Sequence, residues 1–364
     1  MNKEEVWEMY ISKLVLNDFM LFNSLNIDFS KNINIISGEN STGKTAMLKL
    51  LYSATKSISN ANKAKSELTK EQNEELLVSK LQGVFRPDDD KIGRLVRRIQ
   101  GSKSTNIAIT VNENTKLEFG FSSNQEKHLD INQLLRGFVK SVEPIYLPPK
   151  EIISATENFT ALYYEYRIAF EETYYDLALL LDRPLKRGPN TAEQNKVLES
   201  FNNIINGSII QKGKKFYLRV DGQGEFEMGL VSEGYRKLST IIYLILSGSL
   251  NKNSVLFWDE PETNMNPKMI EPIVQALVVL ANMGVQVFIA THDYFLQQCF
   301  SMISEYKPNQ PMLENIDVKF ISFYKENDNI LFESGPTLLD LEHNAIMQEF
   351  DHLYDREQRL FYEV

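Results

Sequence analysis

The sequence has one cysteine, Cys299, among its 364 residues. A single thiol cannot form an internal disulfide, and it cannot supply a cysteine-based metal cluster. Long apolar runs are missing too, because the longest ones, at 241–246 and 276–281, are far shorter than a membrane span. The first residues, MNKEEVWEMYISK, lack the apolar segment of a signal peptide. These absences predict a reduced, soluble protein of the cytoplasm with no membrane partner.

Positive charge is also in deficit. The chain has 39 Lys and Arg against 49 Asp and Glu, a net charge of 39 − 49 = −10. This balance excludes a general, coat-like nucleic-acid binder, although a local basic groove stays possible. Hydrophobic residues make up 43% of the chain, enough to bury a sizeable core, which excludes bulk disorder. We find no internal repeat and no sustained heptad, so a long coiled coil is not expected.

The apolar pattern predicts one α/β domain that spans residues 1–364. An aromatic-rich segment at 145–205 is expected to be a helical insertion, and 301–364 a C-terminal extension of strand and helix. Thr69 and Gln72 have the spacing of a capping box, and 105–121 that of a hairpin turning at 112–114. Other expected strands are 11–16, 25–29, 33–37, 215–220, 254–259, 285–290 and 317–324, and other expected helices are 46–53, 58–80, 234–248, 267–282 and one from about 343.

Residues 38–45 read GENSTGKT and match the phosphate-loop pattern G-x-x-x-x-G-K-[ST] without deviation. In such a loop, backbone N–H groups and the start of the following helix converge on the β-phosphate of a nucleotide. The alternative is a glycine-rich surface turn, but an apolar strand precedes the loop and an amphipathic helix follows it. We expect Lys44 to reach the β- and γ-phosphates and the Thr45 hydroxyl to bind Mg²⁺. The expected ATP-binding residues are Gly38, Asn40, Ser41, Thr42, Gly43, Lys44 and Thr45.

A second apolar strand, 254–259, ends in two acids. Asp259 would lie at the rim of the sheet beside the phosphate loop, where it can hold Mg²⁺ directly or through water. The period of two directs Glu260 to the opposite side, which suits a base that activates the attacking water. The alternative is a strand followed by an acidic turn.

A third apolar strand ends at His292, 32 residues after Glu260 (292 − 260). A histidine after a core strand is often only a structural residue. Here it would reach the same sheet edge as the acids, where it could contact the γ-phosphate. The other histidines, His128, His343 and His352, have no such setting, and we interpret them as surface residues.

Residues 231–237 read VSEGYRK and open an apolar helix. Ser232 and Gly234 at this helix start would present a hydroxyl, backbone N–H groups and the positive end of the helix dipole to an anion. A simple N-cap serine is the alternative, and it is common.

The order of these four segments resembles the ATPase heads of the ABC superfamily, in the SMC-like and OLD-like branch with the AAA-15 and AAA-21 types. The resemblance implies a P-loop ATPase head with a mixed sheet. It also implies a homodimer, or a larger oligomer, in which the signature serine of one head closes over ATP held by the other. The residues it designates are Lys44 and Thr45 in the first phosphate motif, Ser232 and Gly234 in the signature, Asp259 and Glu260 in the second phosphate motif, and His292 as the switch histidine. Gln82 is a candidate for the glutamine loop.

Residues 145–154, IYLPPKEIIS, and the aromatics after them resemble ATPase subunits of bacterial anti-phage systems of the Septu type, which are partnered by an HNH nuclease. The 72 residues after His292 (364 − 292) contain no acidic pair of the D-x-D kind, so we expect any nuclease to be a separate polypeptide. The first hypothesis is therefore an ATP-hydrolysing dimeric switch that regulates a partner nuclease in anti-phage defence.

Two other functions compete with this hypothesis. An SMC-like head for DNA repair or chromosome maintenance would clamp DNA directly. Its basic contacts could come from Lys91, Arg94, Arg97, Arg98 and Lys103, although a solvated surface is the default interpretation of such a cluster. The nucleotide-binding subunit of a membrane transporter is a third candidate. The signature fits a transporter subunit poorly, because Glu233 and Tyr235 replace the usual glycine and glutamine. The segment 261–267, PETNMNP, also fits a transporter subunit poorly.

Overall fold

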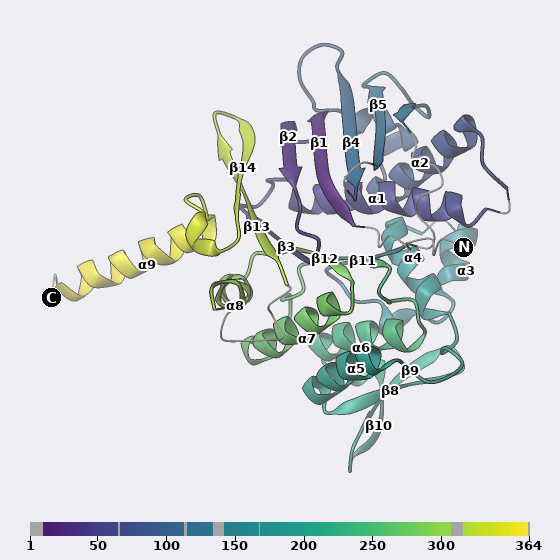
Figure 1. The fold of residues 1–364 in the computed structure, drawn as a ribbon, viewed down its shortest axis with the longest axis vertical. Coiled ribbons are helices and arrows are strands. Elements are labelled where there is room, and N and C mark those ends of the chain that lie inside the picture. The colour runs from purple at the N-terminus through teal and green to yellow at the C-terminus, as the bar shows by residue number, and fades with distance from the viewer. Residues whose placement is uncertain are drawn as a thin grey trace, which may run out of the picture.

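The computed structural model describes residues 10–64, 66–112, 115–133, 142–166, 168–306 and 316–362. A six-stranded sheet runs through the middle of the molecule in the order β14-β13-β3-β12-β11-β7 (Figure 1). Five of its strands are parallel, and β14 is antiparallel to its neighbour at one edge, so the sheet is mixed. The strands are β3 (Ile33–Gly38), β7 (Glu143–Leu147), β11 (Ser254–Asp259), β12 (Gln286–Ala290), β13 (Val318–Glu326) and β14 (Asn329–Gly335).

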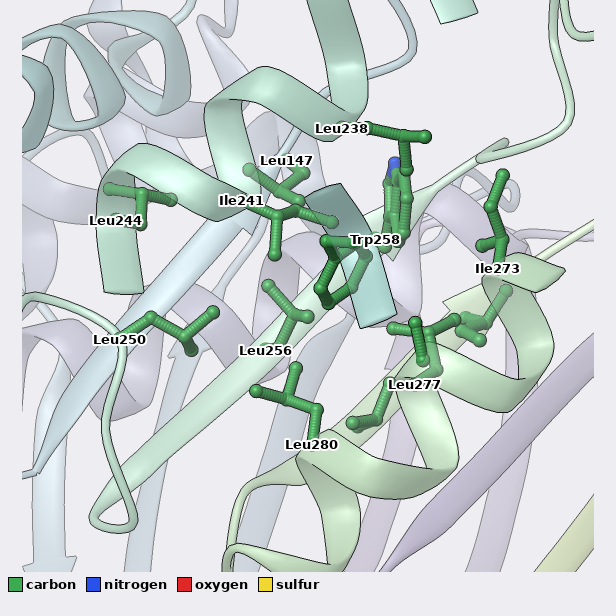
Figure 2. Close-up of a cluster of buried hydrophobic side chains, with 14 of the residues drawn as sticks. Leu147, Leu238, Ile241, Leu244, Leu250, Leu256, Trp258, Ile273, Leu277 and Leu280 are labelled. Atoms are coloured by element: carbon green, nitrogen blue, oxygen red, sulfur yellow. The ribbon is translucent and has the colours of Figure 1, made fainter. Parts of the chain in front are cut away.

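The central strands are buried on both faces, as expected when a parallel sheet is covered on both sides. Every residue of β11 and β12 is buried. Alternate side chains of β11 enter two different cores: Leu256 and Trp258 pack on one side, and Val255 and Phe257 on the other. Figure 2 shows the first of these cores, in which Trp258 lies among leucines and isoleucines of the neighbouring helices.

The second core lies between the central sheet and an antiparallel sheet of order β2-β1-β4-β5-β6. Helix α1 (Lys44–Asn62) runs between the two sheets, and its residues Met47, Leu48 and Leu51 belong to this core (Figure 1). The start of α1 is thereby fixed directly after β3. The strands of the antiparallel sheet are β1 (Ile11–Phe19), β2 (Phe22–Asp28), β4 (Ser104–Val111), β5 (Thr115–Ser122) and β6 (Asp130–Gln133).

Helices and a small sheet of order β10-β9-β8 cover the other face of the central sheet. In the segment 145–205, β7 is followed by three separate helices. The described residues form no long coiled coil, as predicted. The elements on this side are α3 (Phe159–Tyr166), α4 (Glu172–Leu181), α5 (Ala192–Ile205), β8 (Gly207–Lys212), β9 (Lys215–Val220), β10 (Gly224–Glu227), α6 (Glu233–Leu246), α7 (Ile270–Asn282) and α8 (Tyr294–Glu305).

Helix α2 (Lys70–Phe85) begins with the capping box that the sequence predicts, since the Thr69 and Gln72 side chains bond each other's backbone N–H groups. A buried ion cluster attaches this helix to α4. The Lys80 ammonium lies 2.9 Å from the Asp176 carboxylate and 2.6 Å from that of Glu172. Burial alone would lower the pKa of Lys80, but the two carboxylates outweigh it, so the pKa is raised.

The last helix, α9 (Ala345–Tyr362), confirms the helix expected from about 343, but it projects from the body of the molecule (Figure 1). Its first turns contact the body: Met347 packs on the core, and the ring of Phe350 lies 5.0 Å from that of Tyr294. The hairpin β4–β5 is confirmed, although turn positions 113 and 114 fall outside the described residues. Within the described part of the chain, no helix is both long and apolar enough to cross a membrane.

Candidate functional site

The phosphate loop connects the carboxyl end of β3 to the first turn of α1. The loop turns through left-handed backbone at Ser41 (φ 60°) and at Gly43 (φ 93°). A side chain at Gly43 would collide with the ring of Phe22, so this position needs glycine for its conformation and for space. The Thr42 hydroxyl donates to the Glu39 carbonyl at 2.8 Å and closes the loop.

Lys44 is buried, and its ammonium lies against its own loop. Nζ donates to the carbonyls of Gly38 (2.9 Å) and Glu39 (2.8 Å). Burial lowers the pKa of Lys44 to about 8, although the nearby Glu260 and Asp259 carboxylates oppose this shift. The cation is thus held at the phosphate loop, where it would meet a bound phosphate group together with the N–H groups of such a loop.

Asp259, the last residue of β11, is brought to this loop by the strand order. Its Oδ1 accepts a hydrogen bond from the Thr45 hydroxyl at 3.1 Å, and its Oδ2 accepts one from the Tyr146 hydroxyl at 2.9 Å. Burial raises the pKa of Asp259 to about 6, while these two hydrogen bonds act in the opposite direction. The structure therefore brings together the two residues that the sequence designates for a metal.

Thr45 and Asp259 offer oxygen atoms only 3.1 Å apart. Mg²⁺ prefers oxygen ligands, and in nucleotide sites it is bound through one or two carboxylates together with phosphate oxygens and water. The residues present therefore fit Mg²⁺ bound with a nucleotide.

Glu260 stands just beyond the strand, with left-handed backbone (φ 50°). Its N–H donates to the Ala290 carbonyl at the end of β12, at 2.9 Å. We expected the alternation of the strand to direct the Glu260 side chain to the side opposite Asp259. This expectation is wrong, because β11 ends at Asp259 and the backbone turns at the next residue. The Glu260 carboxylate instead accepts a hydrogen bond from Thr263 at 3.2 Å and lies 3.9 Å from Nε2 of His292.

His292 is half-buried beside Glu260, two residues after the end of β12. Burial and the Lys44 cation lower its pKa, and Glu260 opposes them, so the neutral imidazole is favoured near pH 7. A second carboxylate, Glu262, fixes this strand end. Its Oε1 accepts hydrogen bonds from the Thr291 hydroxyl and from the His292 N–H, both at 2.8 Å.

The segment with Ser232 and Gly234 forms the start of α6. Ser232 is the exposed N-cap residue, yet its side chain makes no capping hydrogen bond. Gly234 is buried against Met265 and Met269. Lys237 connects this helix to the acids, because its ammonium donates to the carbonyls of Glu260 (3.1 Å) and Thr263 (2.9 Å).

The remaining candidates lie apart from this arrangement. Gln82 is inside helix α2 and not in a loop, and its side chain donates to the Asp90 carbonyl at 2.7 Å. The basic cluster is largely paired with oxygen atoms of the same chain. Its contacts are Lys91 with Glu126 at 3.1 Å, Arg94 with Asp88 at 2.7 Å, Arg97 with Asn329 at 3.0 Å and Lys103 with Asp18 at 3.4 Å.

No sequence motif assigns a role to Tyr146, Lys237 or Glu262. Two of them had a local signal: Lys237 belongs to the segment that starts α6, and Glu262 follows the acidic pair by two residues. Tyr146 lies in the highlighted segment 145–154, but nothing local pointed to its partner, because Asp259 is 113 residues away in the chain. Only the pairing of β7 with β11 brings the two together.

Two solved structures have a fold similar to that of this chain. The chain resembles the Smc head bound to the C-terminal winged-helix domain of ScpA, with a TM-score of 0.52 and 13% identity over 90% of this chain and 98% of the other. It also resembles the Smc head domain of Pyrococcus furiosus with an extended coiled coil, with a TM-score of 0.50 and 12% identity over 95% and 100%. These likenesses concern the fold.

Two curated relatives match shorter stretches. The DNA replication and repair protein RecF of Clostridium acetobutylicum is 32% identical over 99 residues, 27% of each chain. RecF of Oenococcus oeni is 43% identical over 44 residues, 12% of each chain. The chain thus spans about a quarter or less of the length of these relatives.

The fold and the phosphate loop define an α/β P-loop protein with a mixed central sheet, similar in fold to Smc heads. Residues 33–296 match the family described as "AAA domain, putative AbiEii toxin, Type IV TA system". Because the match covers well over half of the chain, the protein belongs to this family.

Proposed function

We propose that this protein is an ATP-dependent dimeric switch that hydrolyses ATP slowly and controls a separate effector. The observation that carries the proposal is the convergence of three strand ends around Lys44. Three segments meet at the carboxyl ends of the parallel strands: the loop after β3, the acids at the end of β11 and His292 after β12. There Thr45 contacts Asp259, and His292 lies beside Glu260. Ligands of open α/β sheets bind at these strand ends.

Each residue of the site has a separate role in the proposed chemistry. The loop and Lys44 would bind the triphosphate, and Thr45 and Asp259 would hold Mg²⁺, which neutralises negative charge on the phosphates. Glu260 would accept a proton from the attacking water. His292 would contact the γ-phosphate, with Glu262 holding its backbone in place through the hydrogen bond to its N–H.

The dimer is proposed from the start of α6. The exposed Ser232 hydroxyl is not used by its own helix, and the first N–H groups of α6 lie beside it. Such a helix start attracts an anion. ATP held by one protomer would supply that anion to the other, so that binding of ATP shifts the population toward the closed dimer.

The effector is proposed to be a separate nuclease of an anti-phage system. The family description as a toxin of a toxin–antitoxin system supports a defence role. The resemblance of residues 145–154 to Septu-type ATPases supports it as well. A second candidate, direct clamping of DNA in repair, is favoured by the similarity to RecF. It is disfavoured by the basic cluster, since most of its cations already have partners.

Glu260→Gln tests the ATPase assignment. The substitution keeps the size of the side chain but removes the base, so hydrolysis should fall by a factor of about 10² or more, while ATP affinity stays at the parent value. ATP should then remain bound, and the dimer should accumulate. Phosphate release and size-exclusion chromatography with ATP measure both effects. Lys44→Ala, which should lose ATP binding itself, is the control. Hydrolysis by Glu260→Gln at the parent rate would remove Glu260 from the mechanism.

The same Glu260→Gln protein, loaded with ATP, tests the identity of the effector. We expect an affinity pull-down from the native host to recover a nuclease subunit in a fixed ratio, identified by mass spectrometry. Lys44→Ala serves as the matched bait that should not enter the ATP-bound state. Recovery of DNA or of chromosome-maintenance proteins, without a nuclease, would support the second candidate instead.

A further inference from the structure

The Asp259 carboxylate has two different partners, one on each oxygen. Thr45 donates to Oδ1 from the phosphate-loop helix, and Tyr146 donates to Oδ2 from strand β7. Both ends of the Tyr146–Asp259 hydrogen bond are buried, with 2% of Tyr146 and 1% of Asp259 exposed. A carboxylate with a separate donor on each oxygen has its plane fixed.

The position of the Tyr146 hydroxyl is itself fixed by packing. Strand β7 pairs in parallel with β11, and Tyr146 is opposite Phe257 in the register. The Tyr146 ring packs edge-on against Tyr52 of helix α1, with 5.4 Å between the ring centroids. Strand pairing and aromatic packing therefore leave this hydroxyl little freedom to leave Asp259.

We propose that Tyr146 is a positioning residue for the metal ligand Asp259, an inference that rests on the proposed function. By holding Oδ2, Tyr146 keeps the carboxylate from turning, so that Oδ1 stays directed at Thr45, where it would be available to Mg²⁺. The same hydrogen bond satisfies the buried Oδ2 atom.

The chemistry of Mg²⁺ makes this orientation important. The ion requires nearly ideal octahedral geometry, so a carboxylate that can rotate is a poorer ligand. Groups that hydrogen-bond to metal ligands typically change metal affinity by 10–100-fold when they are removed. Tyr146 occupies such a position in this site.

The chain offers a matched control in Tyr52, the ring packed against Tyr146. Tyr52 is also buried, but its hydroxyl donates to Asp176 at 2.6 Å and not to Asp259. Tyr146→Phe and Tyr52→Phe each remove one buried hydroxyl from the same aromatic cluster. Only the first removes a hydrogen bond to the proposed metal ligand.

The experiment measures ATP binding to the full chain by isothermal titration calorimetry, first in EDTA and then over a series of Mg²⁺ concentrations. For Tyr146→Phe we expect parent affinity for ATP in EDTA. The Mg²⁺ concentration that gives half of the metal-dependent gain in affinity should rise about tenfold or more. Tyr52→Phe should keep the parent Mg²⁺ midpoint. Excess Mg²⁺ should restore the affinity of Tyr146→Phe, which a misfolded site would not allow.

Two results would overturn the inference. One is a Mg²⁺ midpoint for Tyr146→Phe equal to that of the parent. The other is an equal loss of ATP affinity in EDTA for both variants, which would give Tyr146 a purely structural role. If the parent protein binds no ATP with or without Mg²⁺, the proposed function fails first, so the two failures are distinguishable.

Discussion

Ser232 occupies the N-cap position of α6, but its side chain accepts no hydrogen bond from that helix. Asp293 shows the usual behaviour at the start of α8, where its carboxylate accepts a bond from the Leu296 N–H at 2.6 Å. The sequence allowed either a capping serine or an anion-binding one. The absent capping bond at Ser232 favours the second interpretation, because the exposed hydroxyl remains available to a partner.

This difference predicts how stability responds to alanine at the two positions. Ser232→Ala should change the free energy of unfolding by less than about 0.5 kcal/mol, as for an ordinary surface substitution. Asp293→Ala should cost about 1 kcal/mol, the typical loss for a helix cap. Urea unfolding measures both, and size-exclusion chromatography should show that Ser232→Ala no longer dimerises with ATP. Equal destabilisation by the two variants would mean that Ser232 is a helix cap in solution.

At the scale of helices and strands, the sequence predicts best where the signal is local. The capping box at Thr69 and the two apolar strands 254–259 and 285–290 each depend on neighbouring residues, and the structure confirms them. Strands β6, β7, β8, β10 and β14 were not predicted. All five lie at sheet edges, where one side of the strand is unpaired.

In the candidate site, too, the residues with a local sequence signal could be predicted and the long-range contacts could not. Lys44, Thr45 and Asp259 could be found from motifs, because each motif contains its own strand or helix. Motifs could not reveal the contacts of Tyr146 with Asp259 and of Glu262 with His292, since these contacts depend on which strands are neighbours. Strand order is a long-range property that local periodicity does not contain. The direction of Glu260 was also missed, because one left-handed residue ends the strand pattern.

At the scale of the whole molecule, the arrangement of the site raises the question of which protomer supplies which residue. Lys44 is buried within its own loop. Ser232 is exposed at the start of a different helix, and the contacts of the segment 233–234 run to residues 264–269. In the proposed dimer each ATP takes Lys44 from one protomer and Ser232 from the other. A two-fold symmetric pair then has two equal sites, each shared between protomers.

Shared sites predict that two inactive variants rescue each other. Lys44→Ala and Ser232→Ala should each hydrolyse little ATP alone. Neither variant should dimerise with itself in ATP, so the dimers of an equal mixture should contain one chain of each. Each mixed dimer keeps one intact site of two, so up to about half of the parent activity should return. Lys44→Ala mixed with the Lys44→Ala, Ser232→Ala double variant is the control, because no dimer there has Lys44. Phosphate release measures the rescue. In a mixed dimer, one chain keeps Lys44 and the other keeps Ser232, so an intact site must use one residue from each chain. Mixed dimers that form but show no activity would therefore contradict sites shared in this way.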